Sequence, residues 1–345
     1  MPEDTGIQTD LSRGGYLIHD SWKKELFALD FSLVPRYNSF QSNLSLVLYF
    51  AGIFLFLLYV RHLIKSIHSA TRKNTGILMV AFILILLNAI LLKMPAPDQM
   101  AGMEIFNPQL FAASNLFPTL ADLLTTSFFV FFLGYIFYTE FKFGDKYKGR
   151  VFQVLQILFF LALIFYFQVI LLLFRSLVVH SSISFETYRV LDISVFTFIG
   201  LFILAMHFAT FSMLLDKFFS LFRPVDTGRK RGVYVVVFAV LTWIMGYIQP
   251  GGPDLLLVLF ITVIAGIFAL IRGSGQVQFK HSTFVLLIFL FSVISLYQIN
   301  KYTTEKRHDE KMVLAVDLSA EHDPVAELLL KNLELDIAAD QELAY

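Results

Sequence analysis

Few side chains within the long apolar stretches of this sequence could do chemistry. The ionisable ones are Lys93, Asp122, Asp192 and His207. Placing an ionisable group inside a membrane costs about 2.5–3.5 kcal/mol on insertion scales, so each of the four needs a partner or water. Lys93, Asp122 and Asp192 are predicted near the outer ends of their helices, whereas His207 is predicted deep within one.

Two interpretations of Lys93, Asp122 and Asp192 are open. They could form one polar cluster beneath the connection 94–117, which contains no Lys or Arg. Such a cluster would be a site for a small ligand or ion, or a gate that links outside signals to the helices. Alternatively, they form an ion pair between helices, with the Lys93 ammonium reaching the membrane interface along its apolar stem. The ion pair is the preferred interpretation.

His207 is a lone histidine, one helical turn from Ile203 and Phe211. An imidazole can titrate near neutral pH, so His207 could act as a proton switch. The preferred interpretation is a histidine whose hydrogen bonds are satisfied within the bundle. Asn88 is likewise interpreted as a polar contact between helices.

Two further motifs resemble catalytic ones. Ser274, between two glycines, could suggest an intramembrane serine protease with His207 as its base, but a flexible turn in a basic cytoplasmic connection is the better interpretation. The run 308–310, His-Asp-Glu, resembles a histidine-kinase phosphoacceptor motif. However, its predicted location is outside the cell, where ATP is absent, and it is interpreted as a solvated helix. The sequence therefore predicts no catalytic site, no metal site and no cofactor.

The composition indicates that lipid is the main solvent for most of the chain. Its 345 residues are 57% hydrophobic and only 16% charged, whereas soluble domains carry about a quarter charged residues. The net charge is zero, which gives no reason to expect nucleic acid as a partner. The sequence has no cysteine, which excludes disulfides, thiolate metal sites and iron–sulfur clusters.

Eight stretches are apolar over about 18 residues, the length that crosses a membrane as a helix. They are predicted at 44–63, 76–92, 119–138, 151–174, 191–215, 233–249, 255–271 and 283–300. Two prolines and two glycines in 250–253 allow only a tight reversal, so the sixth and seventh spans are predicted to be antiparallel neighbours. The predicted fold class is an all-α bundle of about eight transmembrane helices.

Basic residues alternate between the connections. Fifteen Lys and Arg residues lie in 61–75, 139–150, 216–232 and 272–281, against two in the connections between them. Because positively charged loops remain in the cytoplasm, both termini are predicted to be extracytoplasmic.

The two ends of the chain flank the predicted bundle, 44–300. Residues 1–43 have no secretory signal and are predicted to be the end of a truncated sensor unit, with a short tail translocated unaided as the alternative. Residues 301–345 are predicted to continue the eighth span as a helical juxtamembrane segment. Asp323-Pro324 is typical of a helix start. One apolar face follows, which needs a second copy or a following domain as its partner; its residues are Val325, Leu328, Leu329 and Leu333.

The run 314–327, LAVDLSAEHDPVAE, resembles the juxtamembrane segment of large membrane sensor histidine kinases of Bacteroidota-type bacteria. The segments 35–39, 106–114 and 117–122 are similar to that family too. His322 stands where the family has Arg, and Asn107 where it usually has an acidic residue. The resemblance implies a homodimeric signal-transducing bundle in the bacterial inner membrane, acting on a kinase and a response regulator through domains outside this sequence.

The predicted function is therefore the transmembrane signal-transducing region of a two-component sensor histidine kinase. A multipass transporter or permease is the alternative, and it would need paired, Gly/Pro-interrupted spans with polar groups at the midplane. An intramembrane enzyme is a third possibility, but the spans hold no set of His, Asp, Glu and Ser at matching depth.

Overall fold

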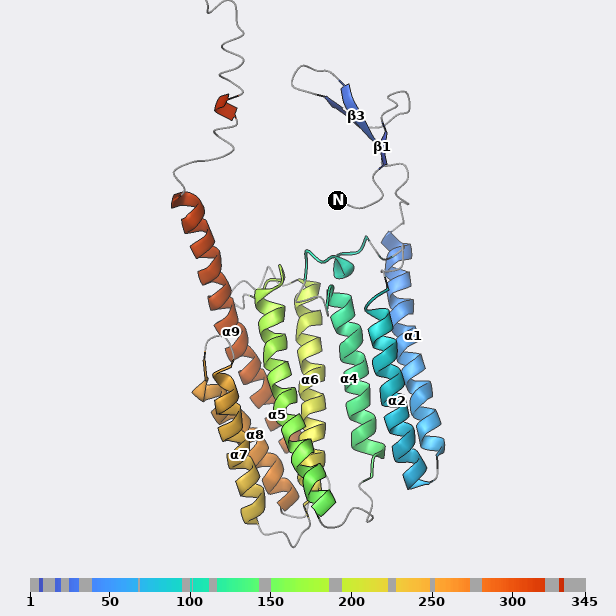
Figure 1. The fold of residues 1–345 in the computed structure, drawn as a ribbon, viewed down its shortest axis with the longest axis vertical. Coiled ribbons are helices and arrows are strands. Elements are labelled where there is room, and N and C mark those ends of the chain that lie inside the picture. Colours follow the sequence, from blue (N-terminus) through green and yellow to red (C-terminus); the bar gives the residue numbers. More distant parts are fainter. Residues whose placement is uncertain are drawn as a thin grey trace, which may run out of the picture. The chain divides into compact units, whose positions relative to one another are not determined.

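The computed structural model describes most of the chain, and Figure 1 shows the arrangement of its elements. The described residues are 6–8, 16–19, 25–30, 39–67, 69–94, 100, 102–111, 117–142, 150–185, 194–222, 228–248, 252–273, 281–319 and 329–331. The chain divides into two compact units, residues 1–58 with 95–103 and residues 59–94 with 104–345. Each unit is described by itself below.

Long helices make up most of the described chain. They are α1 (Ser39–Ser66), α2 (Ala70–Leu91), α4 (Leu120–Glu140), α5 (Arg150–Val179), α6 (Val195–Ser220), α7 (Gly228–Gly246), α8 (Leu255–Gly273) and α9 (His281–Ser319), with a short 3-10 helix, η1 (Glu104–Phe106). Among the described residues, seven of these helices are long and apolar enough to cross a membrane, all except α7. The prediction of a multipass helical membrane protein is therefore confirmed.

Helix α7 differs from the other long helices in its first turn, which contains Arg229, Lys230 and Arg231. These charges leave an apolar part of only 15 residues, 232–246, or about 22 Å at 1.5 Å per residue. The predicted count of eight spans is therefore not confirmed. The second unit shows α7 packed against α8, as expected for the predicted antiparallel pair.

Two glycines shape the reversal between α7 and α8, one through its backbone conformation and the other through close packing. Gly252 has a φ of +75°, in the left-handed region that side chains other than glycine rarely adopt. A Cβ at Gly246 would lie 2.7 Å from the Cα of Pro253. Only a residue without a side chain fits there, so these glycines fix the sharp turn that the sequence predicted.

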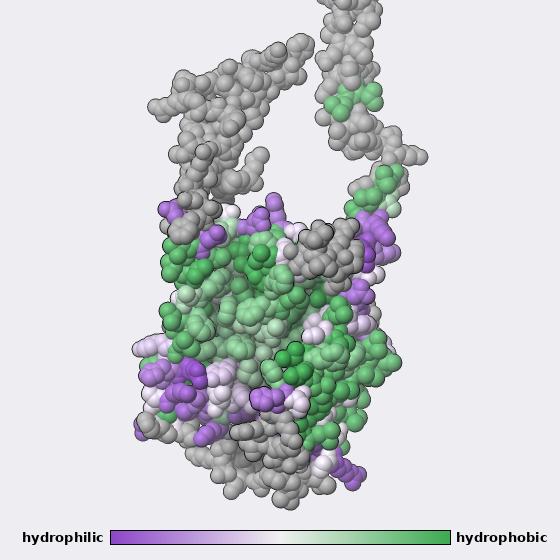
Figure 2. Space-filling view, turned by 180° about the vertical axis from the view of Figure 1, so that it is seen from behind, coloured by the Kyte–Doolittle hydropathy of each residue, from purple (hydrophilic) through white to green (hydrophobic). Residues whose placement is uncertain are grey.

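The core of the second unit is formed by α4, α5 and α6, which are its most buried helices. Helix α2 packs on α4, whereas α7, α8 and α9 pack on α5 and α6. Phenylalanine fills much of this core: Phe160 packs against Phe218 with ring centroids 5.3 Å apart, and Phe167 against Phe211 at 5.4 Å. Figure 2 shows apolar side chains over the middle of the bundle and hydrophilic ones gathered toward its ends.

Two connections cross the end of the bundle at which α5 ends and α6 begins. The Ser182 amide donates to the Leu110 carbonyl at 2.9 Å, which joins the connection after η1 to the one after α5. The side chains of Ile105 in η1, Phe111 after η1 and Ile183 after α5 are buried. This end of the bundle is therefore covered by packed chain.

The first unit contains a small antiparallel sheet that was not predicted from the sequence. Its strands are β1 (Gly6–Gln8), β2 (Tyr16–His19) and β3 (Glu25–Asp30), in the order β1-β3-β2. Gly6 pairs with Asp30, and Tyr16 pairs with Leu29. Strands of three to six residues are too short to show a clear apolar alternation, which is why periodicity did not reveal them.

Candidate functional site

His207 lies at the centre of the bundle, between two other helices. Its Nε2 is 3.1 Å from the Ser127 hydroxyl on α4, and its Nδ1 is 2.9 Å from the Tyr166 hydroxyl on α5. The Ser127 hydroxyl donates its one proton to the Leu123 carbonyl at 2.7 Å. Ser127 must therefore accept from Nε2–H, and the Nδ1 of a neutral imidazole then accepts from Tyr166.

This trio resembles a nucleophile paired with a base, but its environment favours a structural role. Ser127 is 1% exposed and His207 is 6% exposed. The Ser127 proton is directed at a backbone carbonyl of its own helix rather than at the imidazole. The arrangement therefore joins α4, α5 and α6 partway along their lengths, with both imidazole nitrogens satisfied.

The structure does not pair the other two described site residues, Lys93 and Asp122. Asp122 lies in the first turn of α4, where its carboxylate accepts from the Thr119 hydroxyl at 2.7 Å and its amide donates back to that hydroxyl at 3.3 Å. This is the reciprocal bonding of a helix N-cap. Lys93 is exposed after the end of α2, and the described residues show no ion pair between Lys93 and Asp122. Asp192 lies outside the described residues, as does Ser274.

A buried ion pair, which was not predicted from the sequence, joins the ends of α6 and α8. The Arg272 guanidinium donates to both carboxylate oxygens of Asp216, with 2.6 Å between Nε and Oδ1. The Tyr138 hydroxyl on α4 donates to the same carboxylate at 2.8 Å. The Asp216 side chain is only 2% exposed and that of Arg272 is 16% exposed. A two-pronged contact of this kind fixes both distance and orientation.

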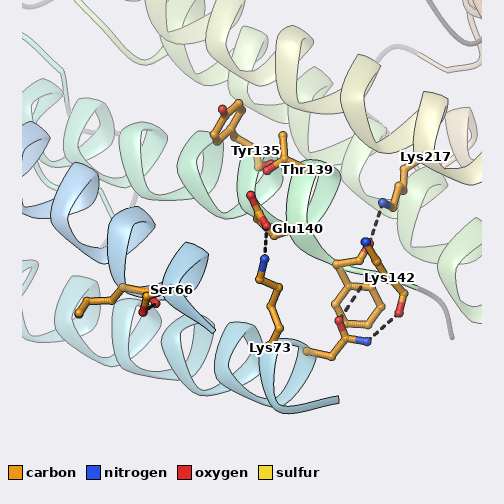
Figure 3. A network of polar contacts seen from close by, with 10 residues as sticks. Ser66, Lys73, Tyr135, Thr139, Glu140, Lys142 and Lys217 are labelled. Carbon is orange, nitrogen blue, oxygen red and sulfur yellow. Dashed lines mark hydrogen bonds and ion pairs between the residues drawn. The ribbon is translucent and has the colours of Figure 1, made fainter. Parts of the chain in front are cut away.

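Further polar contacts lie at the same end of the bundle, which we call the basic face (Figure 3). Lys73 of α2 pairs with Glu140 of α4 at 2.6 Å. The Lys217 ammonium donates to the carbonyls of Tyr138 and Phe141, at 2.9 and 2.7 Å. These carbonyls lie at the C-terminal end of α4 and lack partners within the helix. Lys217 therefore supplies hydrogen bonds that they would otherwise lack.

A second carboxylate, Asp254, lies at the other end of α8. Its Oδ1 accepts from the Leu257 amide at 3.3 Å and so caps α8. Its Oδ2 accepts from the Tyr297 hydroxyl at 2.8 Å and from the Lys301 ammonium at 3.1 Å, both on α9. Burial favours the neutral acid, but the hydrogen bonds and the nearby ammonium outweigh it and hold the pKa of Asp254 below its usual value. Asp254 is therefore a carboxylate at neutral pH.

Two more contacts hold α9 at this end, which we call the opposite face. The Arg175 guanidinium on α5 pairs with Glu305 at 2.8 Å. The Lys306 ammonium donates to the Ser181 carbonyl at 2.6 Å. Together with Asp254, these contacts fasten α9 to both α5 and α8 over the segment 297–306, just where the helix leaves the bundle.

The sequence carries a local signal for Asp254, although Asp254 was not among the predicted site residues. It follows a proline and precedes an apolar run, the pattern of a helix N-cap. Asp216 has no comparable local signal, because it is the contact with Arg272, 56 residues further along the chain, that gives it a role. Among the described residues, no group of three or more His, Cys, Asp or Glu side chains could hold a metal ion.

No protein-family model matches this chain, and no curated protein or solved structure is significantly similar to it. The fold and the contacts above therefore define a class only: a multipass helical membrane protein with buried polar ties between its helices.

Proposed function

We propose that this chain is the transmembrane signal-transducing region of a two-component sensor histidine kinase. The single observation that carries the proposal is α9, one uninterrupted helix of 39 residues. Its length is about 58 Å, nearly twice the roughly 30 Å hydrocarbon core of a bilayer. A helix that starts inside the bundle and continues well beyond it can carry a change in the packing of the bundle to whatever follows.

The exit of α9 supports this role. Its part beyond Lys306 contains charged residues and then exposed apolar ones, among them Met312, Val313 and Leu314. Exposed apolar side chains outside a membrane require a partner. We propose that this partner is a second copy of the protein, so that the unit is a homodimer acting on a kinase and then a response regulator.

The membrane topology is part of the proposal: eight spans in the bacterial inner membrane, with the basic face in the cytoplasm and both termini outside. Helix α7 supports the eighth span because it packs along α8, which is itself long and apolar enough to cross. The two helices are joined by the tight turn at Gly252. The excess of Lys and Arg on the basic face supports the orientation.

The permease alternative has one observation in its favour, the polar trio of Ser127, His207 and Tyr166 at mid-membrane. A transport site should be reachable from water in one conformation, yet Ser127 is 1% exposed and His207 6% exposed. The signalling proposal is therefore the better supported of the two. The reading frame tests the kinase assignment: an ATP-binding kinase lobe in frame after Tyr345 supports it, and a stop codon directly after Tyr345 contradicts it.

Single cysteines introduced into this cysteine-free chain should report its topology. We expect Arg150→Cys, on the basic face, to resist a membrane-impermeant maleimide in intact spheroplasts and to react after lysis. Lys311→Cys, on α9, should react in both. Tyr247→Cys, exposed just after the end of α7, should react in both, like Lys311→Cys, if α7 crosses the membrane. Labelling of Arg150→Cys but not of Lys311→Cys in intact spheroplasts would overturn the orientation.

A further inference from the structure

We propose that α8 couples the basic face of the bundle to the segment 297–306, where α9 leaves the bundle, by moving along its own axis. The role of this coupling in signalling rests on the proposed function, whereas the experiments below test the coupling itself. It commits to a specific route: a displacement of Asp216 at the end of α6 moves Arg272, then α8 along its axis, then Asp254, and finally Lys301 on α9.

The first tie lies at the C-terminal end of α8. The Arg272 guanidinium donates to both carboxylate oxygens of Asp216, and the Tyr138 hydroxyl on α4 donates to the same carboxylate. The Asp216 side chain is only 2% exposed. A lateral or axial shift of Arg272 relative to Asp216 would separate this buried carboxylate from its counter-charge. Because that is unfavourable, the end of α8 has to follow the ends of α6 and α4.

The second tie lies at the N-terminal end of the same helix. Asp254 is bound to the first turn of α8 through the Leu257 amide, so its carboxylate moves with the helix. The same carboxylate binds Tyr297 and Lys301, which lie four residues apart on one face of α9. Its pKa is held below the usual value, so the ionic part of this tie persists at neutral pH.

The helix between the ties suits transmission along its axis. It has 19 residues, or about 28 Å, and its described part contains no charged residue between Asp254 and Arg272. Its buried face, which includes Ile261, Ile264 and Phe268, is aliphatic and aromatic. Apolar side chains make no directional bonds, so they resist an axial shift less than the ionic ties at the two ends do.

Spin labels at Val195→Cys on α6 and Val313→Cys on α9 give a direct measure of the exit angle of α9. Both positions are exposed, at 71% and 62%. Val313 lies about 18 Å beyond Lys301, so a tilt of about 10° displaces it by about 3 Å. In the full chain in lipid nanodiscs, Arg272→Met should shift this distance by about 3 Å or more. Asp216→Asn with Arg272→Met, which leaves no lone buried charge, should give the same shift.

The matched control is Lys73→Met, which breaks an ion pair on the same basic face that does not involve α8. It should leave the distance between the labels unchanged. An unchanged distance in the Arg272 variants, or an equal shift in Lys73→Met, would overturn the proposal. Failure here leaves the reading-frame test of the kinase assignment unaffected.

A double-mutant cycle gives a second, independent measure. Residues more than about 10 Å apart normally act additively. If α8 couples its two ends, the combined effect of Arg272→Met and Lys301→Met on the unfolding equilibrium constant should differ by about fivefold or more from the product of the single effects. The control cycle of Lys73→Met with Lys301→Met should equal the product. A simple product in both cycles would show that the two ends of α8 are independent.

Discussion

Replacing Arg272 by methionine should lower the free energy of unfolding by about 3–5 kcal/mol, the cost expected when one partner of a buried ion pair is removed. The reason lies with the residue left behind. Asp216 would lose its charged partner in a site where its side chain is 2% exposed, with the Tyr138 hydroxyl still donating to its carboxylate. Methionine has about the length of the arginine stem, so the loss would reflect charge rather than packing.

A more exposed ion pair of the same bundle is the matched control. Arg175 and Glu305 have side chains that are 26% and 29% exposed, so Arg175→Met should cost about 1 kcal/mol or less. Unfolding by SDS in mixed micelles measures both variants. Adding Asp216→Asn to Arg272→Met removes the lone charge and should recover part of the loss. Equal losses of unfolding free energy in Arg272→Met and Arg175→Met would contradict the interpretation that the buried Asp216 carboxylate requires Arg272 as its partner.

The elements of the bundle were predictable because backbone hydrogen bonding in lipid leaves a long apolar segment no choice but a helix. Seven predicted spans correspond to helices that are long and apolar enough to cross a membrane. The exception is α7, whose helix begins five residues before the predicted span and includes Arg229, Lys230 and Arg231. Helix ends near an interface can extend into charged sequence, since water and headgroups solvate the side chains there.

The contacts between helices were much less predictable. A helix that is apolar on all sides gives no sign of which face turns inward, so the sequence identified His207 without its partners Ser127 and Tyr166. The Asp216 contacts depend on three helices meeting at one end of the bundle. Residue types and spacing reveal such a meeting only when the partners lie within a turn or two of each other, as Thr119 and Asp122 do.

Buried charge appears at both faces of the bundle but not in the middle of the described helices, where the polar contacts are made by neutral groups such as Ser127, His207 and Tyr166. This distribution follows from the cost of ionised groups at mid-membrane. Near the faces, a charge can be partly desolvated and still find a partner from another helix. The strongest ties between helices therefore lie at their ends, as they do for α8.

Among the described glycines, Gly134 has the closest neighbour, and its site should be sensitive to one added methyl group. A Cβ at Gly134 of α4 would lie 2.6 Å from the Cγ2 of Thr210 on α6, far inside the normal contact distance. Thr210 has little freedom to move aside, because its hydroxyl donates to the Met206 carbonyl at 2.9 Å and β-branching restricts its rotamers. Gly134→Ala should therefore lower the free energy of unfolding by about 1–3 kcal/mol, as overpacking in a well-filled core does.

A second substitution, Thr210→Ala, should rescue the stability lost in Gly134→Ala, because it removes the methyl group that the new Cβ meets. Gly134→Ala with Thr210→Ala should be close in stability to Thr210→Ala alone. Gly266→Ala on α8 is the control, because a Cβ there meets nothing within 4 Å, and it should be neutral or stabilising by up to about 1 kcal/mol. If Gly134→Ala behaved like Gly266→Ala in the same unfolding assay, α4 and α6 would not approach each other this closely. Ser127 and His207 lie further along the same two helices and depend on the same close approach. Gly134→Ala should therefore also weaken the hydrogen bond between Ser127 and His207.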